Sequence, residues 1–271
     1  YGLVGSEMCI RDSSYIGLPT SVIHSLNFDQ EVSRSAIGQP IGSFYAYKED
    51  GLFQSEAEIK SYTNNKGELL QPNAKPGDIK FVDVNGDGVI DGNDRDYIGN
   101  PLPDVTAGLT LGVNFHNFDL SLFFQGMFGN DVYDLTRYVG DFYNQSQYNK
   151  NSRVVNAWTP TNTNTDIPRV TMDDPNNNIR PSSYYVQDAS FVRLKNMKIG
   201  YSVPQSILSK IKFNSLYIYA QATNLFTITG YDGIDPEVGL QSYSSDYRNL
   251  DMGVARGIYP LSRTFTFGVN V

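Results

Sequence analysis

Cysteine, long apolar runs and a secretory leader are absent or nearly absent from this sequence. Only one of its 271 residues is cysteine, Cys9, so a framework of internal disulfides is excluded. No run of about 18 apolar residues occurs, which excludes a membrane-spanning helix. The amino terminus also lacks the basic, apolar and small residues, in that order, of a secretory signal. These absences do not exclude a transmembrane β-barrel, because alternating strands give such a protein an ordinary overall hydropathy.

Basic residues and catalytic motifs are also scarce. The chain has 21 Lys and Arg residues against 29 Asp and Glu residues, which argues against a nucleic-acid partner because phosphate binding needs clustered positive charge. His24 and His116 lie far apart, and no phosphate-binding loop, dinucleotide fingerprint or nucleophile elbow occurs. Asp173 and Asp174 could act as glycosidase carboxylates, but solvated loop charges are the favoured interpretation. We therefore predict that the chain is not an enzyme.

Residues 1–14 differ from the rest of the chain. They read YGLVGSEMCIRDSS, with neither helical nor strand periodicity, and they include Cys9. This stretch resembles a translated adapter sequence, so we predict that it is non-native; a disordered native stretch is the alternative. Fold predictions are therefore confined to residues 15–271, which contain no cysteine nucleophile and no thiolate metal ligand.

What the sequence does contain favours an all-β fold. Its 19 Tyr, 15 Phe and 24 Gly residues accompany only 18% charged residues, a composition typical of strands and turns. Apolar and polar residues alternate over 105–115 and again over 118–128, with Phe123 as the exception, and the His116–Asn117 pair between them predicts a β-hairpin. Each arm is about as long as a tilted membrane-crossing strand of roughly 9–11 residues. Soluble sandwiches show the same alternation in strands nearer five or six residues.

Other segments predict shorter elements and one long loop. The predicted strands cover 43–52 (with a turn at 49–51), 190–204, 216–226 and 263–271, and the predicted short helices cover 55–62 and 205–211. The alternation changes phase at 195–197, which indicates a β-bulge. Residues 129–189 show no sustained period and are predicted as a long loop, which is uncommon in a compact soluble domain but typical of the outer end of a membrane barrel.

Residues 83–94, DVNGDGVIDGND, have the spacing of a calcium-binding loop. The candidate ligands at loop positions 1, 3, 5, 7, 9 and 12 are Asp83, Asn85, Asp87, the carbonyl of Val89, Asp91 and Asp94. Oxygen ligands at alternate positions suit Ca²⁺, and Gly88 supplies the turn at position 6. Asp94 stands where the longer Glu is usual. The prediction is a structural Ca²⁺ site, and the alternative is an Asx and Gly turn that binds nothing.

Aromatic residues in the long polar segment are candidate substrate contacts. They are Tyr138, Phe142, Tyr143 and Trp158. Their flat rings could stack on sugar rings, whereas local packing accounts for loop aromatics equally well.

Several sequence blocks, in order, resemble one protein family. They lie at 41–54, 77–109, 118–134, 189–204, 219–237 and 259–271, and they include IGSFYAYKEDGLFQ, ASFVRLKNMKIGYSVP and YPLSRTFTFGVNV. Together they resemble the carboxy-terminal part of SusC/RagA-type TonB-dependent outer-membrane transporters. The terminal RTFTFGVNV is similar to the family's last strand but lacks its closing aromatic residue.

The resemblance implies a fold, a location and partners. It implies that 15–271 is the carboxy-terminal part of a 22-stranded antiparallel barrel in the bacterial outer membrane, with the plug domain absent from this sequence. Such transporters import oligosaccharides, or peptides in some members, together with a SusD-like surface lipoprotein, and are energised by the TonB complex. Outer-membrane lipid would surround the strands. We expect the segment alone to be inactive, because unpaired strand edges in hydrocarbon cost several kcal/mol per backbone group.

The leading hypothesis is therefore glycan import. A peptide importer is the alternative within the family. The rival outside it is a secreted, calcium-stabilised β-rich binding or adhesion module, and a glycoside hydrolase is a distant third.

Overall fold

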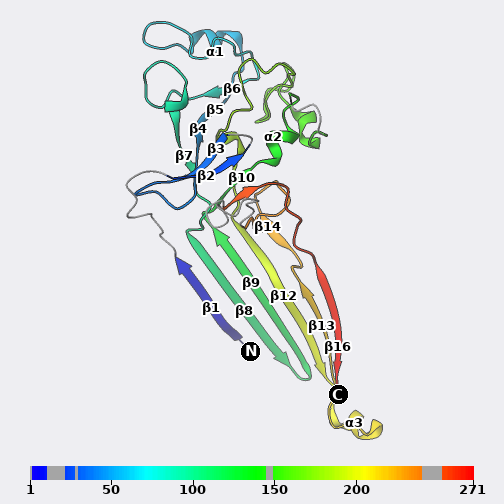
Figure 1. Ribbon diagram of the computed structural model, residues 1–271. Coiled ribbons are helices and arrows are strands. Elements are labelled where there is room, and N and C mark those ends of the chain that lie inside the picture. Colours follow the sequence, from blue (N-terminus) through cyan, green and yellow to red (C-terminus); the bar gives the residue numbers. More distant parts are fainter. Residues whose placement is uncertain (1, 11–21, 28–29, 145–148, 240–251) are drawn as a thin grey trace.

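One large antiparallel sheet stands below a layer of smaller sheets and loops (Figure 1). The computed structural model describes residues 2–10, 22–27, 30–144, 149–239 and 252–271. Strands in the large sheet follow the order β1-β8-β9-β12-β13-β16, with β14 paired to β12, and all these pairings are antiparallel. The predicted all-β class is confirmed. No helix among these residues is both long and apolar enough to cross a membrane.

Five strands of the large sheet agree with the sequence pattern. They are β8 (Val105–Phe115), β9 (Phe118–Phe128), β12 (Phe191–Ser202), β13 (Tyr217–Thr223) and β16 (Thr264–Asn270). The sheet also contains β1 (Gly2–Ile10) and the three-residue β14 (Thr227–Thr229). The hairpin β8–β9 turns at His116, whose φ of 54° is the left-handed conformation that a two-residue hairpin turn uses. The short helix α3 (Gln205–Ile211) joins β12 to β13 as predicted.

Strand β1 was not predicted. It pairs with β8 along most of its length, from the pair of Gly2 and Gly112 to that of Ile10 and Val105. Residues 1 and 11–14 of the same stretch lie outside the described residues. The non-native origin of 1–14 stays a prediction, because strand pairing does not report where a segment came from.

The large sheet has one apolar and one polar face. Directly paired residues share a face, so the register that pairs Leu111 with Leu122 and Gly112 with Ser121 separates the two sets. The apolar face carries Leu109, Leu111, Val113, Leu120, Leu122, Phe124, Met197, Ile199, Ile218, Phe265, Phe267 and Val269. Several of these are exposed, including Phe267 at 80% of its surface. An exposed apolar face of this extent is unfavourable in water and suited to hydrocarbon.

Two irregularities interrupt the alternation of the large sheet. The predicted bulge is confirmed, because the pairing of β12 with β9 shifts between Leu194 and Asn196. Residues three apart in a regular strand lie on opposite faces, but the extra residue of the bulge leaves Leu194 and Met197 on the same face. Phe123 lies on the polar face, where its ring lies beside Gly108; a Cβ at Gly108 would lie at an ordinary contact distance of 3.5 Å from it.

The upper layer consists of three small sheets and short helices. One sheet contains β2 (Val22–Asn27), β3 (Gln30–Ser35), β4 (Ser43–Tyr47) and β7 (Arg95–Gly99); the second contains β5 (Glu49–Leu52) and β6 (Ile79–Phe81); the third contains β10 (Asp131–Asp134), β11 (Val186–Asp188) and β15 (Val254–Ala255). Helix α1 (Glu56–Ser61) lies within the helix predicted at 55–62 and is capped by Ser55, and α2 spans Thr136–Gly140. The turn predicted at 49–51 lies instead inside β5.

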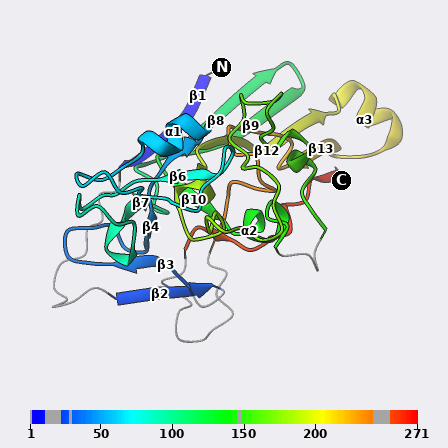
Figure 2. The same cartoon turned by 90° about the horizontal axis from the view of Figure 1, so that it is seen from above.

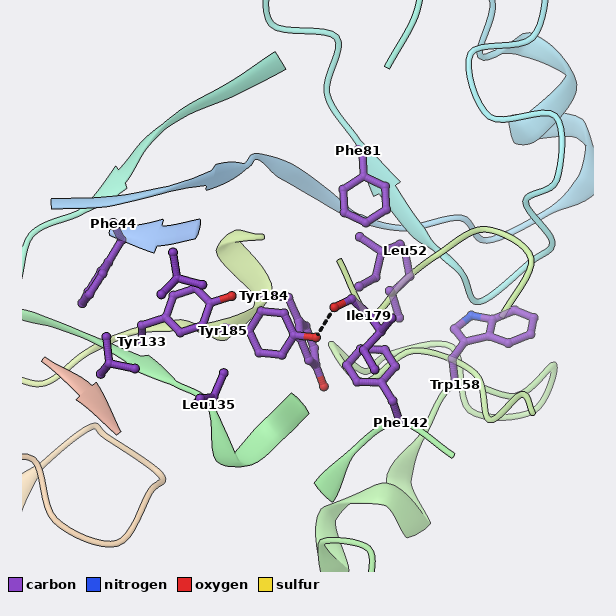
Figure 3. Close-up of a cluster of buried hydrophobic side chains, with 13 residues drawn as sticks. Phe44, Leu52, Phe81, Tyr133, Leu135, Phe142, Trp158, Ile179, Tyr184 and Tyr185 are labelled. Atoms are coloured by element: carbon purple, nitrogen blue, oxygen red, sulfur yellow. Dashed lines mark hydrogen bonds between the residues drawn. The ribbon is translucent and has the colours of Figure 1, made fainter. Parts of the chain in front are cut away.

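The core of the upper layer is aromatic and comes from distant segments (Figure 3). The rings of Tyr133 and Tyr185 stack with centroids 5.3 Å apart, and the Tyr185 hydroxyl donates to the carbonyl of Ile179 at 2.9 Å. These residues belong to the segment 129–189 that was predicted as a long loop. The segment is instead packed, because its strands and 3₁₀ turns of three to five residues are too short to show a period.

Substituting Gly268 with Ala should destabilise the sheet by about 1–3 kcal/mol through overpacking. A Cβ at Gly268 would overlap the ring of Tyr219 on the neighbouring strand. The temperature at which the whole protein unfolds in detergent measures the effect. Gly230→Ala is the control, since a Cβ there meets nothing within 4 Å; an equal loss in both variants would contradict the packing argument. Adding Tyr219→Ala should relieve the overlap at Gly268.

Candidate functional site

The loop predicted to bind calcium is closed by its own hydrogen bonds. Asp94 is fully buried, and its carboxylate accepts from the amides of Val84 at 2.9 Å, Asn85 at 3.3 Å and Asp91 at 2.7 Å. Asp83 accepts from the amides of Gly86 and Gly88 at 2.7 and 2.8 Å. Asx-type bonds of this kind hold a turn without an ion.

The remaining candidate ligands lie near the surface of the loop. Asp87 accepts from the amide of Val89 and from the side chain of Asn85, while Asp91 caps the short helical turn that follows it. Within the described part of the chain, no three His, Cys, Asp or Glu side chains come together as a metal site. The geometry therefore favours the closed turn, and calcium binding stays a prediction from the spacing.

Asp94→Ala should destabilise the loop by about 1–3 kcal/mol, because buried amides lose their acceptor. Hydrogen exchange of the Val84 and Asp91 amides in the whole protein reports this directly. Asp87→Ala is the matched control on the exposed side of the loop and should change exchange at these two amides little. Equal effects of the two substitutions would contradict the role of Asp94.

A thermal unfolding experiment on the same protein tests the calcium prediction. Millimolar calcium should raise the melting temperature of the unmodified protein over that in chelator, since a ligand that binds only the folded state stabilises it. Asp87→Ala should remove the shift by deleting a ligand. An unchanged melting temperature would contradict calcium binding and leave the self-closed turn.

The four candidate aromatics lie in or against hydrophobic clusters. Phe142 and Trp158 are buried in the main aromatic core and Tyr138 packs against it, as Figure 3 shows for Phe142 and Trp158. The Trp158 indole donates to the side-chain oxygen of Gln54 at 3.0 Å. Tyr143 packs against a separate small cluster. Local packing thus accounts for all four, and their contact with substrate stays a prediction.

A polar cleft opens beside these aromatics. Its larger part has a volume of about 460 Å³ and is lined by Arg153, Asn156, Asn162, Asn164, Thr165, Asp166, Ile167 and Asp232. A smaller part of about 190 Å³ shares Thr165 and Asp166 and adds Glu49, Arg137 and Tyr184 among others. We call the two parts together the polar cleft. Ile167 is the only apolar residue of its larger part, so this lining offers mainly hydrogen-bond donors and acceptors.

Two arginines organise the charges of the cleft. Arg137, which is only 6% exposed, pairs with Asp232 at 2.9 Å and donates to the carbonyl of Tyr184 at 2.8 Å. Arg153 pairs with Asp166 at 3.0 Å and lies 3.7 Å from Asp232. The carboxylates of Asp166 and Asp232 are more than half exposed, so each keeps acceptor capacity for a ligand.

Burial changes the acidity of groups at the base of the cleft. It raises the pKa of Glu49, with the charges of Asp50 and Asp166 adding to the effect. It also raises the pKa of Tyr184 well above its usual value, as does the charge of Asp141. Tyr184 therefore stays a neutral hydroxyl that donates to Asp141 at 2.6 Å. The cleft presents fixed donors and acceptors of the kind that bind polar, uncharged groups.

Sequence reasoning did not identify this cleft. Arg137 and Asp232 are 95 positions apart in the chain, and each is an ordinary charged residue in its own segment. The acidic pair that was considered for glycosidase chemistry lies elsewhere: Asp174 accepts from the amides of Asn178 and Ile179, so it closes a turn.

A buried ionic cluster fastens the segment after β14 to β12. Arg193 is 2% exposed and binds Asp235 at 2.6 Å and Glu237 at 3.0 Å; Lys195, at the bulge, binds Glu237 at 2.7 Å. Asp235 also accepts from the amide of Leu261 at 3.1 Å. We call these four side chains the β12 latch, which joins three parts of the chain.

Acid should open the β12 latch. Burial raises the pKa of Asp235, but its hydrogen bonds with Glu237, Arg193 and Leu261 outweigh burial and hold the pKa below its usual range. A carboxyl whose pKa is lowered by folding stabilises above its unfolded value of about 3.9 and loses this contribution as the pH falls through the folded value. In the whole protein, the protection factor of the Leu261 amide, which corrects hydrogen exchange for its intrinsic pH dependence, should therefore fall below about pH 4.

Asp235→Asn is the matched variant for this experiment. It should exchange faster at neutral pH and lose most of the acid-dependent change, because the titrating group is gone. Asp188→Asn, in the same layer but outside the latch, should behave as the unmodified protein. An acid response that survives in Asp235→Asn would assign it to another group.

Comparison with known proteins gives consistent relatives. The chain is 36% identical over 248 residues to TonB-dependent receptor P3 of Formosa agariphila, covering 92% of this chain and 23% of the relative. It is 34% identical to receptor P26 of the same organism, covering 88% and 23%, and 26% identical to TonB-dependent receptor SusC of Bacteroides thetaiotaomicron, covering 89% and 20%. The chain thus spans about a quarter of the length of the first two relatives. No protein-family model matches it.

Solved structures share the fold. The RagAB peptide transporter matches with a TM-score of 0.62 at 23% identity, covering 88% of this chain and 23% of that one. The RagAB peptide importer in its open-open state matches with a TM-score of 0.64 at 22% identity, covering 95% and 24%. At this identity the likeness concerns the fold.

Proposed function

We propose that this chain supplies carboxy-terminal strands and outer loops of a nutrient importer. The premise is its family: the chain belongs to the SusC/RagA-type TonB-dependent receptors of the bacterial outer membrane and corresponds to a segment of one. The relatives are receptors rather than enzymes, which agrees with a role in binding and passage. The plug, the TonB complex and a SusD-like lipoprotein are the partners that such an importer needs.

The observation that carries this proposal is the two-faced sheet. Strands β8 and β9 are 11 residues long and β12 is 12 residues long, enough for tilted strands to cross hydrocarbon. Their apolar face is exposed, and their other face carries polar residues such as Asn114, Ser121 and Gln125. A short turn closes one end of the hairpin while the packed layer covers the other (Figure 1). This asymmetry is typical of an outer-membrane barrel, with the short turns on the periplasmic side.

We propose oligosaccharides as the imported substrate. The polar cleft supports this, because hydroxyl groups both donate and accept, and the cleft offers amides, carboxylates and guanidinium groups side by side. Peptides are the second candidate, since the solved structures with this fold are peptide transporters. A peptide would also bind amide and carboxylate groups, so the two classes must be separated by measurement.

Asp166→Ala in the full-length receptor, assembled with its lipoprotein partner, should weaken substrate binding by about 10–100-fold. This is the loss expected when a charged acceptor of a hydrogen bond is removed. Asp173→Ala is the matched control, because Asp173 is an exposed acid outside the cleft. Calorimetry with an oligosaccharide panel and with a peptide library measures the affinities.

The outcomes separate the proposals. Oligosaccharide binding that falls in Asp166→Ala and is kept in Asp173→Ala supports the cleft as a glycan site. Binding of peptides alone would replace the substrate class, and equal loss in the two variants would remove the cleft from the site. Failure of the receptor to insert into outer membranes would overturn the importer itself.

A further inference from the structure

We propose that the short-turn end of the sheet binds an anionic phospholipid of the periplasmic leaflet. Two neighbouring features would hold it: a groove on the apolar face takes an acyl chain, and two lysines at the end of α3 take the phosphate. The proposal rests on the outer-membrane placement given above. It concerns a lipid site, so it is separate from the substrate cleft at the opposite end of the sheet.

The groove has a volume of about 400 Å³ and crosses four strands near their turn ends. Its apolar lining includes Phe118, Ile199, Tyr201, Ile218, Phe267 and Val269. The rings of Phe118 and Tyr201 lie 4.6 Å apart at its border. Because the groove is continuous with the lipid-facing side of the sheet, a hydrocarbon chain is the occupant that matches its surroundings.

Helix α3 adds basic and apolar groups at the same end. It projects beyond β12 and β13, away from the upper layer (Figures 1 and 2). Leu208 is buried and anchors it, whereas Ile207 and Phe213 are exposed, as are Lys210 and Lys212. A combination of exposed apolar and basic residues is typical of segments that lie in a membrane interface.

Charge complementarity selects an anionic head group. Residues 203–216 contain two lysines and no acidic residue, although the whole chain carries a net charge of -8. Helix α3 starts three residues after Ser202, the last residue of β12; at about 3.3 Å per residue this is within about 10 Å of the strand end. A phosphate near α3 and an acyl chain in the groove can therefore belong to one lipid.

The backbone conformation of Lys212 independently supports a role for its side chain. Lys212 ends α3 with a φ of 57°, in the left-handed region where Gly is usual and a longer side chain is disfavoured. A lysine in this conformation costs free energy that a glycine would not, which points to a use for its side chain. Here the use would be the positive charge.

The strain also provides a sharp variant. Lys212→Gly removes the charge and relieves the backbone, so loss of lipid in this variant cannot be attributed to misfolding. We expect Lys212→Gly to weaken retention of phosphatidylglycerol about fivefold, and Lys210→Gln with Lys212→Gly about 30-fold. This corresponds to about 1 kcal/mol per lysine near an anionic surface. Lys66→Gln, an exposed lysine of the upper layer, is the control and should retain lipid normally.

Native mass spectrometry of the full-length receptor, released from membranes containing phosphatidylethanolamine with or without phosphatidylglycerol, measures the retained lipid. Ala220→Phe should fill the groove and reduce retention while leaving the lysines unchanged. Excess inorganic phosphate should not displace the lipid, since the acyl chain in the groove also contributes to binding. These results together would support the proposal.

Other outcomes would overturn it. Equal retention of phosphatidylglycerol in the unmodified protein and the double-lysine variant would exclude the head-group site. Displacement of the lipid by inorganic phosphate would show that the lysines bind anions in general and that the groove does not hold an acyl chain. A receptor dimer that dissociates in the double variant, with lipid unchanged, would assign the surface to a second copy. The importer proposal would survive each of these results, because the readout is lipid retention and not uptake.

Discussion

Alternation in strict register is the constraint on which the rest of this structure depends. In hydrocarbon every backbone amide and carbonyl needs a partner inside the protein, and a slip of one residue would exchange the apolar and polar faces. The strands therefore have little freedom of pairing. The bulge at Lys195 shows how the constraint is met: the chain accommodates an extra residue, and Leu194 still lies on the face that Met197 and Ile199 occupy.

The upper layer solves a different problem. Its strands are too short for a long alternating pattern, so side chains far apart in sequence hold them together instead. Asp78 is fully buried and binds the guanidinium of Arg169 at 2.6 Å and the amide group of Asn178 at 2.9 Å. These bonds span 91 and 100 residues. A buried charge is tolerated only when it is paired and hydrogen-bonded, which makes this cluster a fixed point of the layer.

The difference explains what could be predicted from the sequence. The β8–β9 hairpin, the bulge and α3 were predicted correctly, because each follows from the order of neighbouring residues. The core formed by Tyr133 and Tyr185 was predicted as loop, since a four-residue strand and a three-residue 3₁₀ turn give no period. The polar cleft was not predicted at all: Arg137 and Asp232 meet only because the fold brings them together. The spacing of oxygen ligands predicts a calcium loop. It does not predict that Asp94 is buried and accepts hydrogen bonds from amides of the same loop.

The cleft and the sheet are joined by a very short stretch of chain. Asp232, which pairs with Arg137 in the cleft, is three residues from Asp235, which Arg193 holds against β12. Three residues cannot absorb much displacement, so a movement of Asp232 must be taken up either by the latch or by the cleft. Because Arg193 and Asp235 are both buried, breaking their pair would leave uncompensated charge. The contacts of the polar cleft should therefore change more readily than those of the β12 latch. The latch fixes one wall of the cleft to strand β12.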